Sequence, residues 1–101
     1  MSTKLSIIVT TWNNEKFIGR CLDSILNHDF NETYEILIGN DCSTDATTEI
    51  VEQYRKQHPN IIKHIMRSSN VGTSENFVDL IERAEGEFLA QLDGDDFIID
   101  V

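Results

Sequence analysis

The chain has 101 residues, of which 40% are hydrophobic and 26% charged, and its formal net charge is −10. This length and composition suit one globular domain with a single core and exclude a disordered chain. The negative charge excludes nucleic acid as a partner, because the surface would repel phosphates, and no apolar run reaches the ~18 residues of a membrane span. We therefore expect a cytoplasmic protein, or one peripheral to the inner face of a membrane when part of a longer chain.

Apolar strands alternate with one-faced helices along the chain. Four runs of apolar, partly β-branched residues predict strands, at residues 5–11, 34–39, 61–67 and 88–92. Between them, apolar residues at helical spacing predict helices, at about residues 15–27, 46–58 and 74–84. Asn14 is expected to cap the first helix, and Asp45 or Ser43 the second. The third helix is expected to bury Phe77 and Val78.

This alternation predicts an α/β fold, namely a Rossmann-like, three-layer α/β/α arrangement with a mostly parallel sheet. In such sheets, ligands bind beyond the carboxyl ends of the strands, where the strand order reverses. Polar loops follow three of the expected strands, at residues 11–14, 40–45 and 93–96. If the first strand is central, these loops converge on one site.

Three carboxylates, those of Asp93, Asp95 and Asp96, fall within four residues directly after the last expected strand. Negative charges this close repel one another unless a cation lies among them. Mg²⁺ and Mn²⁺ prefer oxygen ligands, and Mg²⁺ is usually held by one or two carboxylates together with substrate phosphates. The run therefore indicates either a metal site or a solvated acidic turn. The chain has neither a Gly-x-Gly-x-x-Gly motif nor a Gly-Lys-Ser/Thr motif, so a nucleotide would depend on a metal to hold its phosphates.

Four segments share an order and spacing with a known family. They are residues 6–13 (Ser-Ile-Ile-Val-Thr-Thr-Trp-Asn), 40–45 (Asn-Asp-Cys-Ser-Thr-Asp), 70–77 (Asn-Val-Gly-Thr-Ser-Glu-Asn-Phe) and 84–96, which ends in an Asp-x-Asp motif. Together they resemble the nucleotide-binding half of family 2 glycosyltransferases, which have the GT-A fold. The chain departs from the usual family pattern at several positions: Thr10 replaces Pro, Asn40 replaces Asp, Cys42 replaces Gly, and Glu75 precedes Asn76 where many members have Arg.

The resemblance implies roles for individual residues. Those expected to contact the nucleotide are Thr11, Trp12, Asn13, Glu15, Asp41 and Asp93. Trp12 would pack on uracil as the family's Tyr does, and Asp41 would accept the uracil N3–H. Asp93 and Asp95 would be the ligands of Mg²⁺ or Mn²⁺. Simpler interpretations stay open, with Trp12 as a core aromatic, Asp41 as a turn residue and Glu15 as a surface acid.

The implied activity is metal-dependent transfer of a sugar, with inversion, from a nucleoside diphosphate sugar to an acceptor hydroxyl. We expect a UDP-sugar as donor and a glycan, lipid or protein as acceptor. The family's catalytic base and acceptor-binding half have no counterpart in residues 1–101, so we expect no catalytic residue here and an inactive isolated chain. Uncovered apolar residues at Phe97, Ile98 and Ile99 would then favour self-association at the truncated sheet edge.

Two alternatives remain open from the sequence. One is a non-catalytic module that holds nucleotide or metal. The other is an enzyme like the sugar nucleotidyltransferases, which normally have a Gly-rich, basic phosphate loop near the first strand, unlike Trp12-Asn13-Asn14. A phospho-acceptor signalling domain is excluded, because no lysine follows Lys63.

Overall fold

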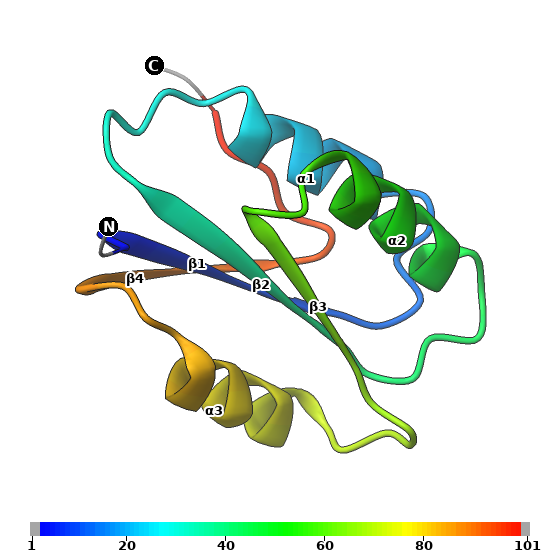
Figure 1. The fold of residues 1–101 in the computed structure, drawn as a ribbon. Coiled ribbons are helices and arrows are strands. Elements are labelled where there is room, and N and C mark those ends of the chain that lie inside the picture. Colours follow the sequence, from blue (N-terminus) through cyan, green and yellow to red (C-terminus); the bar gives the residue numbers. More distant parts are fainter. Residues whose placement is uncertain (1–2, 100–101) are drawn as a thin grey trace.

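The computed structural model describes residues 3–99, which form a three-layer α/β/α fold (Figure 1). Strands and helices alternate strictly, as the sequence predicts. The elements are β1 (Leu5–Thr11), α1 (Ile18–Leu26), β2 (Tyr34–Asn40), α2 (Thr47–Gln57), β3 (Ile62–Met66), α3 (Thr73–Arg83) and β4 (Phe88–Asp93). The longest described helices, α2 and α3, have 11 residues each, and no helix within residues 3–99 could cross a bilayer.

The four described strands form one parallel sheet in the order β3-β2-β1-β4. β1 lies in the middle, pairing with β2 on one side and β4 on the other, so that Thr11 lies opposite Asn40 and Thr10 opposite Asp93. The predicted central position of the first strand is therefore confirmed. Because the strand order reverses at β1, the loops after β1, β2 and β4 meet at one edge of the sheet.

The two faces of the sheet are covered by different helices. α1 and α2 lie on one face and α3 on the other (Figure 1). Alternate residues of β1 divide accordingly: Ile7 and Val9 join the larger core beneath α1 and α2, whereas Ile8 packs with Leu37 and Leu80 on the α3 side. Each such buried aliphatic side chain stabilises the fold by roughly 1.5–3 kcal/mol.

The start of the first helix differs from the prediction. α1 begins at Ile18, and residues 15–17 form a turn in which Phe17 is exposed. The side chain of Asn14 does not cap this helix, because its Oδ1 accepts hydrogen bonds from Thr11 Oγ1 (2.7 Å) and the Trp12 amide (3.2 Å). The Asn14 carbonyl instead accepts the amides of Phe17 and Ile18.

The second helix begins close to the predicted position, at Thr47, but its N-cap residue is Ala46 and not Asp45 or Ser43. Asp45 Oδ1 accepts the amide of Thr47 at 2.9 Å and satisfies one donor in the first turn of α2. Ser43 does not share this role, because its hydroxyl donates to Asn40 Oδ1.

β4 is not the buried strand that its apolar sequence suggests. Among the described strands it pairs with β1 alone and forms the edge of the sheet, and α3 packs on β1 and β2. Phe88 is 61% exposed and Leu89 50%. Val78 of α3, predicted to face inward, is 52% exposed. An apolar run indicates a strand but not whether a second neighbour covers it.

The segment after β4 is only partly uncovered. Phe97 and Ile99 are exposed, as predicted, but Ile98 packs against the core under α1 and its amide donates to Ser24 Oγ at 2.9 Å. The prediction for Ile98 was therefore wrong, because the chain turns back over α1 after β4. Self-association at this edge remains a prediction.

A buried carboxylate joins the elements at the amino ends of the strands, opposite to the ends where the three loops meet. Glu35 accepts hydrogen bonds from Ser6 Oγ (2.6 Å), Lys63 Nζ (2.7 Å) and the Glu85 amide (2.7 Å), and Gly86 donates to Ser6 Oγ. Burial acts to raise the pKa of Glu35, but the hydrogen bonds, led by that of Lys63, outweigh it and hold the pKa below its usual range. This network ties β1, β2, β3 and the α3–β4 connection together.

Candidate functional site

An open cavity of about 300 Å³ lies at the carboxyl ends of β1, β2 and β4. Its lining comes from the three polar loops and from the start of α3. The lining residues are Thr10, Thr11, Trp12, Asn14, Asp41, Thr73, Asn76, Asp93 and Asp95. The predicted convergence of the three loops is therefore confirmed, and the predicted site residues that line the cavity are Thr11, Trp12, Asp41, Asp93 and Asp95.

Asn13 and Glu15 do not line the cavity. Asn13 adopts a left-handed backbone (φ 49°), and its Oδ1 accepts the amide of Thr44 at 2.8 Å. The Glu15 side chain is exposed, and its amide donates to Asp45 Oδ2 at 3.2 Å. Both residues bond the loop after β1 to the loop after β2, so in this structure they hold the two loops together without facing the cavity.

Trp12 is 54% exposed at the cavity, which is incompatible with a core aromatic. Thr11, one residue earlier, is buried and donates to Asn14 Oδ1. The change from buried to exposed side chains thus falls at the last residue of β1. An exposed indole beside a polar cavity offers a flat apolar surface for a planar ligand.

Asp41 anchors the loop that precedes α3. Its carboxylate accepts the amides of Val71 (2.7 Å) and Gly72 (3.1 Å), and its carbonyl accepts a hydrogen bond from Asn70 Nδ2. Asp41 is only 8% exposed but lines the cavity. Each carboxylate oxygen has two lone pairs, so this fold-stabilising role leaves acceptor capacity for a ligand.

A buried polar network supports Asp41 from the adjacent position. Asn40 Oδ1 accepts the amide and the hydroxyl of Ser43, which fixes the orientation of the Asn40 side-chain amide. Its Nδ2 therefore donates to Thr48 Oγ1 (2.9 Å) and to His64 Nε2 (3.2 Å). His64 Nδ1 then donates to Glu52 at 2.7 Å. Sequence reasoning missed this network, because no motif includes His64.

Glu52 is held ionised by its neighbours. The hydrogen bond from the Arg55 guanidinium, and then that from His64, lower the pKa of Glu52 to about 2. Glu52 is thus a constant acceptor for the His64 ring, and the ring in turn keeps the Asn40 amide in place behind the cavity.

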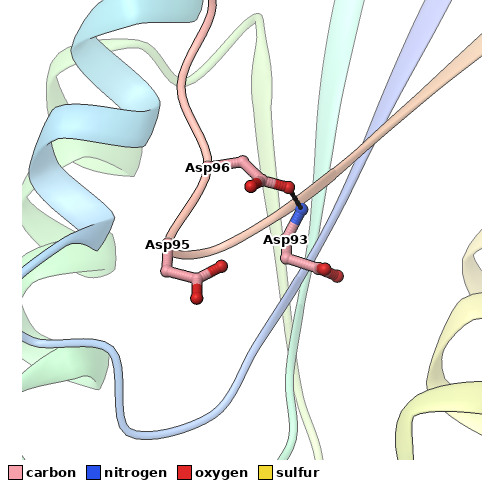
Figure 2. Close-up of side chains that lie close together, drawn as sticks. All are labelled: Asp93, Asp95 and Asp96. Carbon is pink, nitrogen blue, oxygen red and sulfur yellow. Dashed lines mark hydrogen bonds between the residues drawn. The ribbon is translucent and has the colours of Figure 1, made fainter.

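The acidic turn, residues 93–96, forms the opposite wall. Figure 2 shows Asp93, Asp95 and Asp96 gathered around the turn, with the Asp96 carboxylate directed at the Asp93 amide, which donates to it at 3.0 Å. Thr10 Oγ1 donates to Asp93 Oδ1 at 3.2 Å. Gly94 is buried against Thr11 and Asn14, and its amide donates to the Thr10 carbonyl at 2.9 Å.

The acidic turn has the donor set that a hard divalent cation prefers. One carboxylate oxygen from each of Asp93, Asp95 and Asp96 lies within 4.8 Å of the other two, and all three residues are exposed. Within residues 3–99, no lysine or arginine side chain forms an ion pair with them. All-oxygen ligation on an open turn suits Mg²⁺ or Mn²⁺ and leaves room for ligands from a substrate.

The negative charge of this turn affects the buried thiol of Cys21. Burial, followed by the charges of Asp96 and Asp95, raises the pKa of the Cys21 thiol to about 12. The thiol donates to the Asp93 carbonyl at 3.7 Å. Cys21 is therefore a protonated core residue, as its place in the apolar stripe of the first helix indicates.

Further cavity residues were not assigned to the site from the sequence. Thr10 was noted only as a departure from the family pattern, Asn14 as a helix cap, and Thr73 not at all. Asn76, which the sequence suggested either for the phosphate side of the site or as an ordinary helix residue, is buried in the α3 layer, where its Nδ2 donates to the Gly39 carbonyl at 2.9 Å. A side chain at Gly39 would overlap Asn76, a close approach that only the structure reveals.

A parallel sheet with an acidic turn and an exposed aromatic at its switch point defines an α/β domain that binds its ligand across the strand ends. The chain belongs to glycosyl transferase family 2, whose sequence profile matches residues 6–100.

Two relatives in this family act on the same kind of polymer, according to their names. The chain is 40% identical over 97 residues to poly(ribitol-phosphate) beta-N-acetylglucosaminyltransferase TarS of Staphylococcus aureus, covering 94% of this chain and 17% of that protein. It is 38% identical over 98 residues to poly(ribitol-phosphate) beta-glucosyltransferase of Bacillus spizizenii, covering 94% of this chain and 15% of that protein. The chain thus spans less than a fifth of the length of either.

Solved structures show the same arrangement. TarS residues 1–349 in complex with UDP-GlcNAc superimpose with a TM-score of 0.84 at 38% identity, over 95% of this chain and 28% of that one. TarS has also been solved with UDP. A mannosyltransferase from Pyrobaculum calidifontis, solved with GDP-Man and Mn²⁺, gives a TM-score of 0.85 over 96% of this chain and 29% of that one, at 23% identity, which shows the shared fold. The chain therefore corresponds to the N-terminal, GT-A part of TarS.

Proposed function

We propose that residues 1–101 are the nucleotide-sugar-binding half of a metal-dependent, inverting glycosyltransferase whose donor is a UDP-sugar. The observation that carries the proposal is that Trp12 and the acidic turn lie on the same cavity. A nucleoside diphosphate has a planar base at one end and an anionic diphosphate at the other. An exposed indole and a cluster of metal-binding oxygens match these two ends.

The base would bind between the loops after β1 and β2. Trp12 would pack on its face, and Asp41 would accept the uracil N3–H with lone pairs that Val71 and Gly72 do not use. Thr11 would complete the pocket beside them. TarS, which is 38% identical over this region, has been solved with UDP, and this supports uracil as the base.

Asp93 and Asp95 would hold Mg²⁺ or Mn²⁺. When bound, the ion would neutralise negative charge on the departing diphosphate. Asp96 has a different task, because its carboxylate accepts the Asp93 amide and keeps the turn closed. Thr10 donates to Asp93 Oδ1 and so would restrain this carboxylate, whose other oxygen is left for the ion.

We further propose that the acceptor-binding half and the catalytic base belong to other parts of a longer enzyme. The chain covers at most 28% of the TarS proteins with which it was compared. On its own it would bind the donor without turnover, as a non-catalytic module would. The acceptor is a hydroxyl of a glycan, lipid or protein, and the proposed location is the cytoplasm or the inner face of a membrane. Membership of the family argues against a nucleotidyltransferase.

Isothermal titration of the chain with UDP, GDP and dTDP, with and without Mn²⁺, tests the proposal. We expect UDP to bind more tightly than the other two, and Mn²⁺ to strengthen UDP binding at least tenfold. Equal binding with and without Mn²⁺, or binding to no nucleotide, would contradict the assignment.

The variant Asp95→Ala tests the metal site directly. We expect it to abolish the Mn²⁺-dependent part of UDP binding while leaving the fold intact by circular dichroism. Glu82→Ala, in the last turn of α3 on the opposite edge of the sheet, removes the same charge and should bind as the unaltered chain does. Retained Mn²⁺ dependence in Asp95→Ala would mean that the turn is only a solvated acidic surface.

A further inference from the structure

We propose that Arg20 of α1 is a positioning residue for the acidic turn. It holds residues 93–96 in the shape that binds the metal, without touching the metal or the nucleotide. The inference rests on the metal site proposed above and adds a residue that lies in none of the four family segments.

The chain after β4 is fastened to one side of α1. Figure 1 shows this segment turning back from the end of β4 to run beside α1. Three side chains of α1 bond to its backbone: Arg20 Nη2 donates to the Asp95 carbonyl (3.3 Å), the Cys21 thiol to the Asp93 carbonyl (3.7 Å), and Ser24 Oγ accepts the Ile98 amide (2.9 Å). The contacts are spread over residues 93–98, so α1 holds the segment along this length.

Arg20 contributes a second kind of contact that its neighbours on α1 cannot. Its guanidinium carbon lies 4.2 Å from the centre of the Phe97 ring and 5.7 Å from that of Phe17. A guanidinium at this distance from an aromatic face is attracted to it and packs flat against it. Phe97 follows the acidic turn directly. Arg20 therefore contacts the turn itself at Asp95 and the residue just after it at Phe97.

The bond to Asp95 leaves its metal-binding atoms available. Arg20 donates to the backbone carbonyl of Asp95, and within residues 3–99 the Asp95 carboxylate accepts no hydrogen bond. On its other side the turn packs through Gly94 on Thr11 and Asn14. The turn is thus held from both sides while its three acidic residues stay exposed, which is the preorganisation that a metal site needs.

This role predicts an effect opposite to that of simple electrostatics. Removing a positive charge beside three carboxylates should, by Coulomb's law alone, strengthen the binding of a cation. If Arg20 positions the turn, its removal lets the carboxylates separate and weakens binding. Partners outside the metal's direct ligands commonly change metal affinity by 10–100-fold, and we expect about tenfold weaker Mn²⁺ binding for Arg20→Ala.

The test is titration of Mn²⁺ alone, followed by electron paramagnetic resonance of the free ion. Arg20→Ala should bind about tenfold more weakly than the unaltered chain. Phe97→Leu, which removes the ring without changing charge, should weaken binding in the same direction. Lys56→Ala, in the last turn of α2 at the opposite edge of the sheet, is the charge-matched control and should have no effect. Unchanged or tighter binding in Arg20→Ala would overturn the proposal.

A readout without metal separates this proposal from the proposed function. The Asp96 amide donates to the Asp93 carbonyl, and the Ile98 amide to Ser24 Oγ. Hydrogen exchange at these two amides, measured by NMR without metal, should become several-fold faster in Arg20→Ala and stay unchanged in Lys56→Ala. If the unaltered chain binds no Mn²⁺, the proposed metal site fails, and the exchange rates alone decide whether Arg20 holds the turn. Unchanged exchange in Arg20→Ala would refute its positioning role.

Discussion

Replacing Gly94 by alanine should damage the acidic turn through one methyl group. A Cβ at this position would lie 2.5 Å from Thr11 Oγ1 and 2.6 Å from Asn14 Oδ1. Neither atom can retreat freely, because Thr11 Oγ1 donates to Asn14 Oδ1 at 2.7 Å, and the same Oδ1 accepts the Trp12 amide. The contact therefore meets a fixed group and not the mobile end of a long side chain.

The cost can be worked out for each way of relieving the overlap. If Thr11 and Asn14 move, their hydrogen bond is lost, at about 0.5–1.5 kcal/mol. If the turn moves instead, the bond from the Gly94 amide to the Thr10 carbonyl is lost at a similar cost. Residual overpacking adds to either, since an extra methyl group in a packed site commonly costs about 1–3 kcal/mol. We expect a total of about 1.5–4.5 kcal/mol and a substantially weaker affinity for Mn²⁺.

Urea unfolding and Mn²⁺ titration measure the two effects. Gly72→Ala is the matched control, because Gly72 has φ 91° and ψ 158° and open space where the added methyl group would lie, so alanine there costs about 1–3 kcal/mol from backbone strain alone. Both variants should be less stable, but only Gly94→Ala should lose affinity for Mn²⁺. A Gly94→Ala protein with unaltered unfolding midpoint and Mn²⁺ affinity would refute the steric reasoning.

Four other outcomes can be checked. Glu35→Gln should lower stability by about 1–3 kcal/mol at pH 7. Because the folded-state pKa of Glu35 is depressed, the difference in stability should narrow as pH falls below the ordinary range of a glutamate carboxyl, and a constant difference in urea unfolding would contradict this. Cys42→Gly should raise the unfolding midpoint, adding about 0.5–1 kcal/mol, since Cys42 has φ 62°; a lower midpoint would disprove the strain. Ellman's reagent should label Cys42 in the folded protein but Cys21 only after unfolding, and equal rates would show otherwise. The double variant Phe88→Lys, Leu89→Lys should be monomeric in light scattering where the unaltered chain associates, and equal masses would exclude the β4 edge as the contact.

The fold was predictable because its signals are local and agree with one another. The apolar runs, the helical stripes and the short connections each indicate one element, and alternation leaves a parallel sheet as the simplest arrangement. Burial at the edge was not predictable in this way. Phe88 and Leu89 have the composition of a central strand, and only the pairing of β4 shows that one side of it has no neighbour in residues 3–99.

Within the site, residues that act through side chains at strand ends were easier to predict than residues that act through the backbone. Asp41, Asp93 and Asp95 line the cavity as expected. Asn13 looked like a ligand-binding residue, but its left-handed backbone turns its side chain to the neighbouring loop. Cys42 adopts the conformation for which glycine is best suited, which accounts for the family's usual residue there but could not be read from one sequence.

The location of the Glu35 network has a consequence for how such a domain can change. Its hydrogen bonds join the strands at their amino ends, whereas the candidate ligand contacts come from loops at their carboxyl ends. Substitutions that alter which nucleotide or sugar fits the cavity therefore leave the hydrogen bonds of the Glu35 network unchanged. A scaffold divided in this way can acquire new donor preferences in small steps, each of which begins from a protein that still folds.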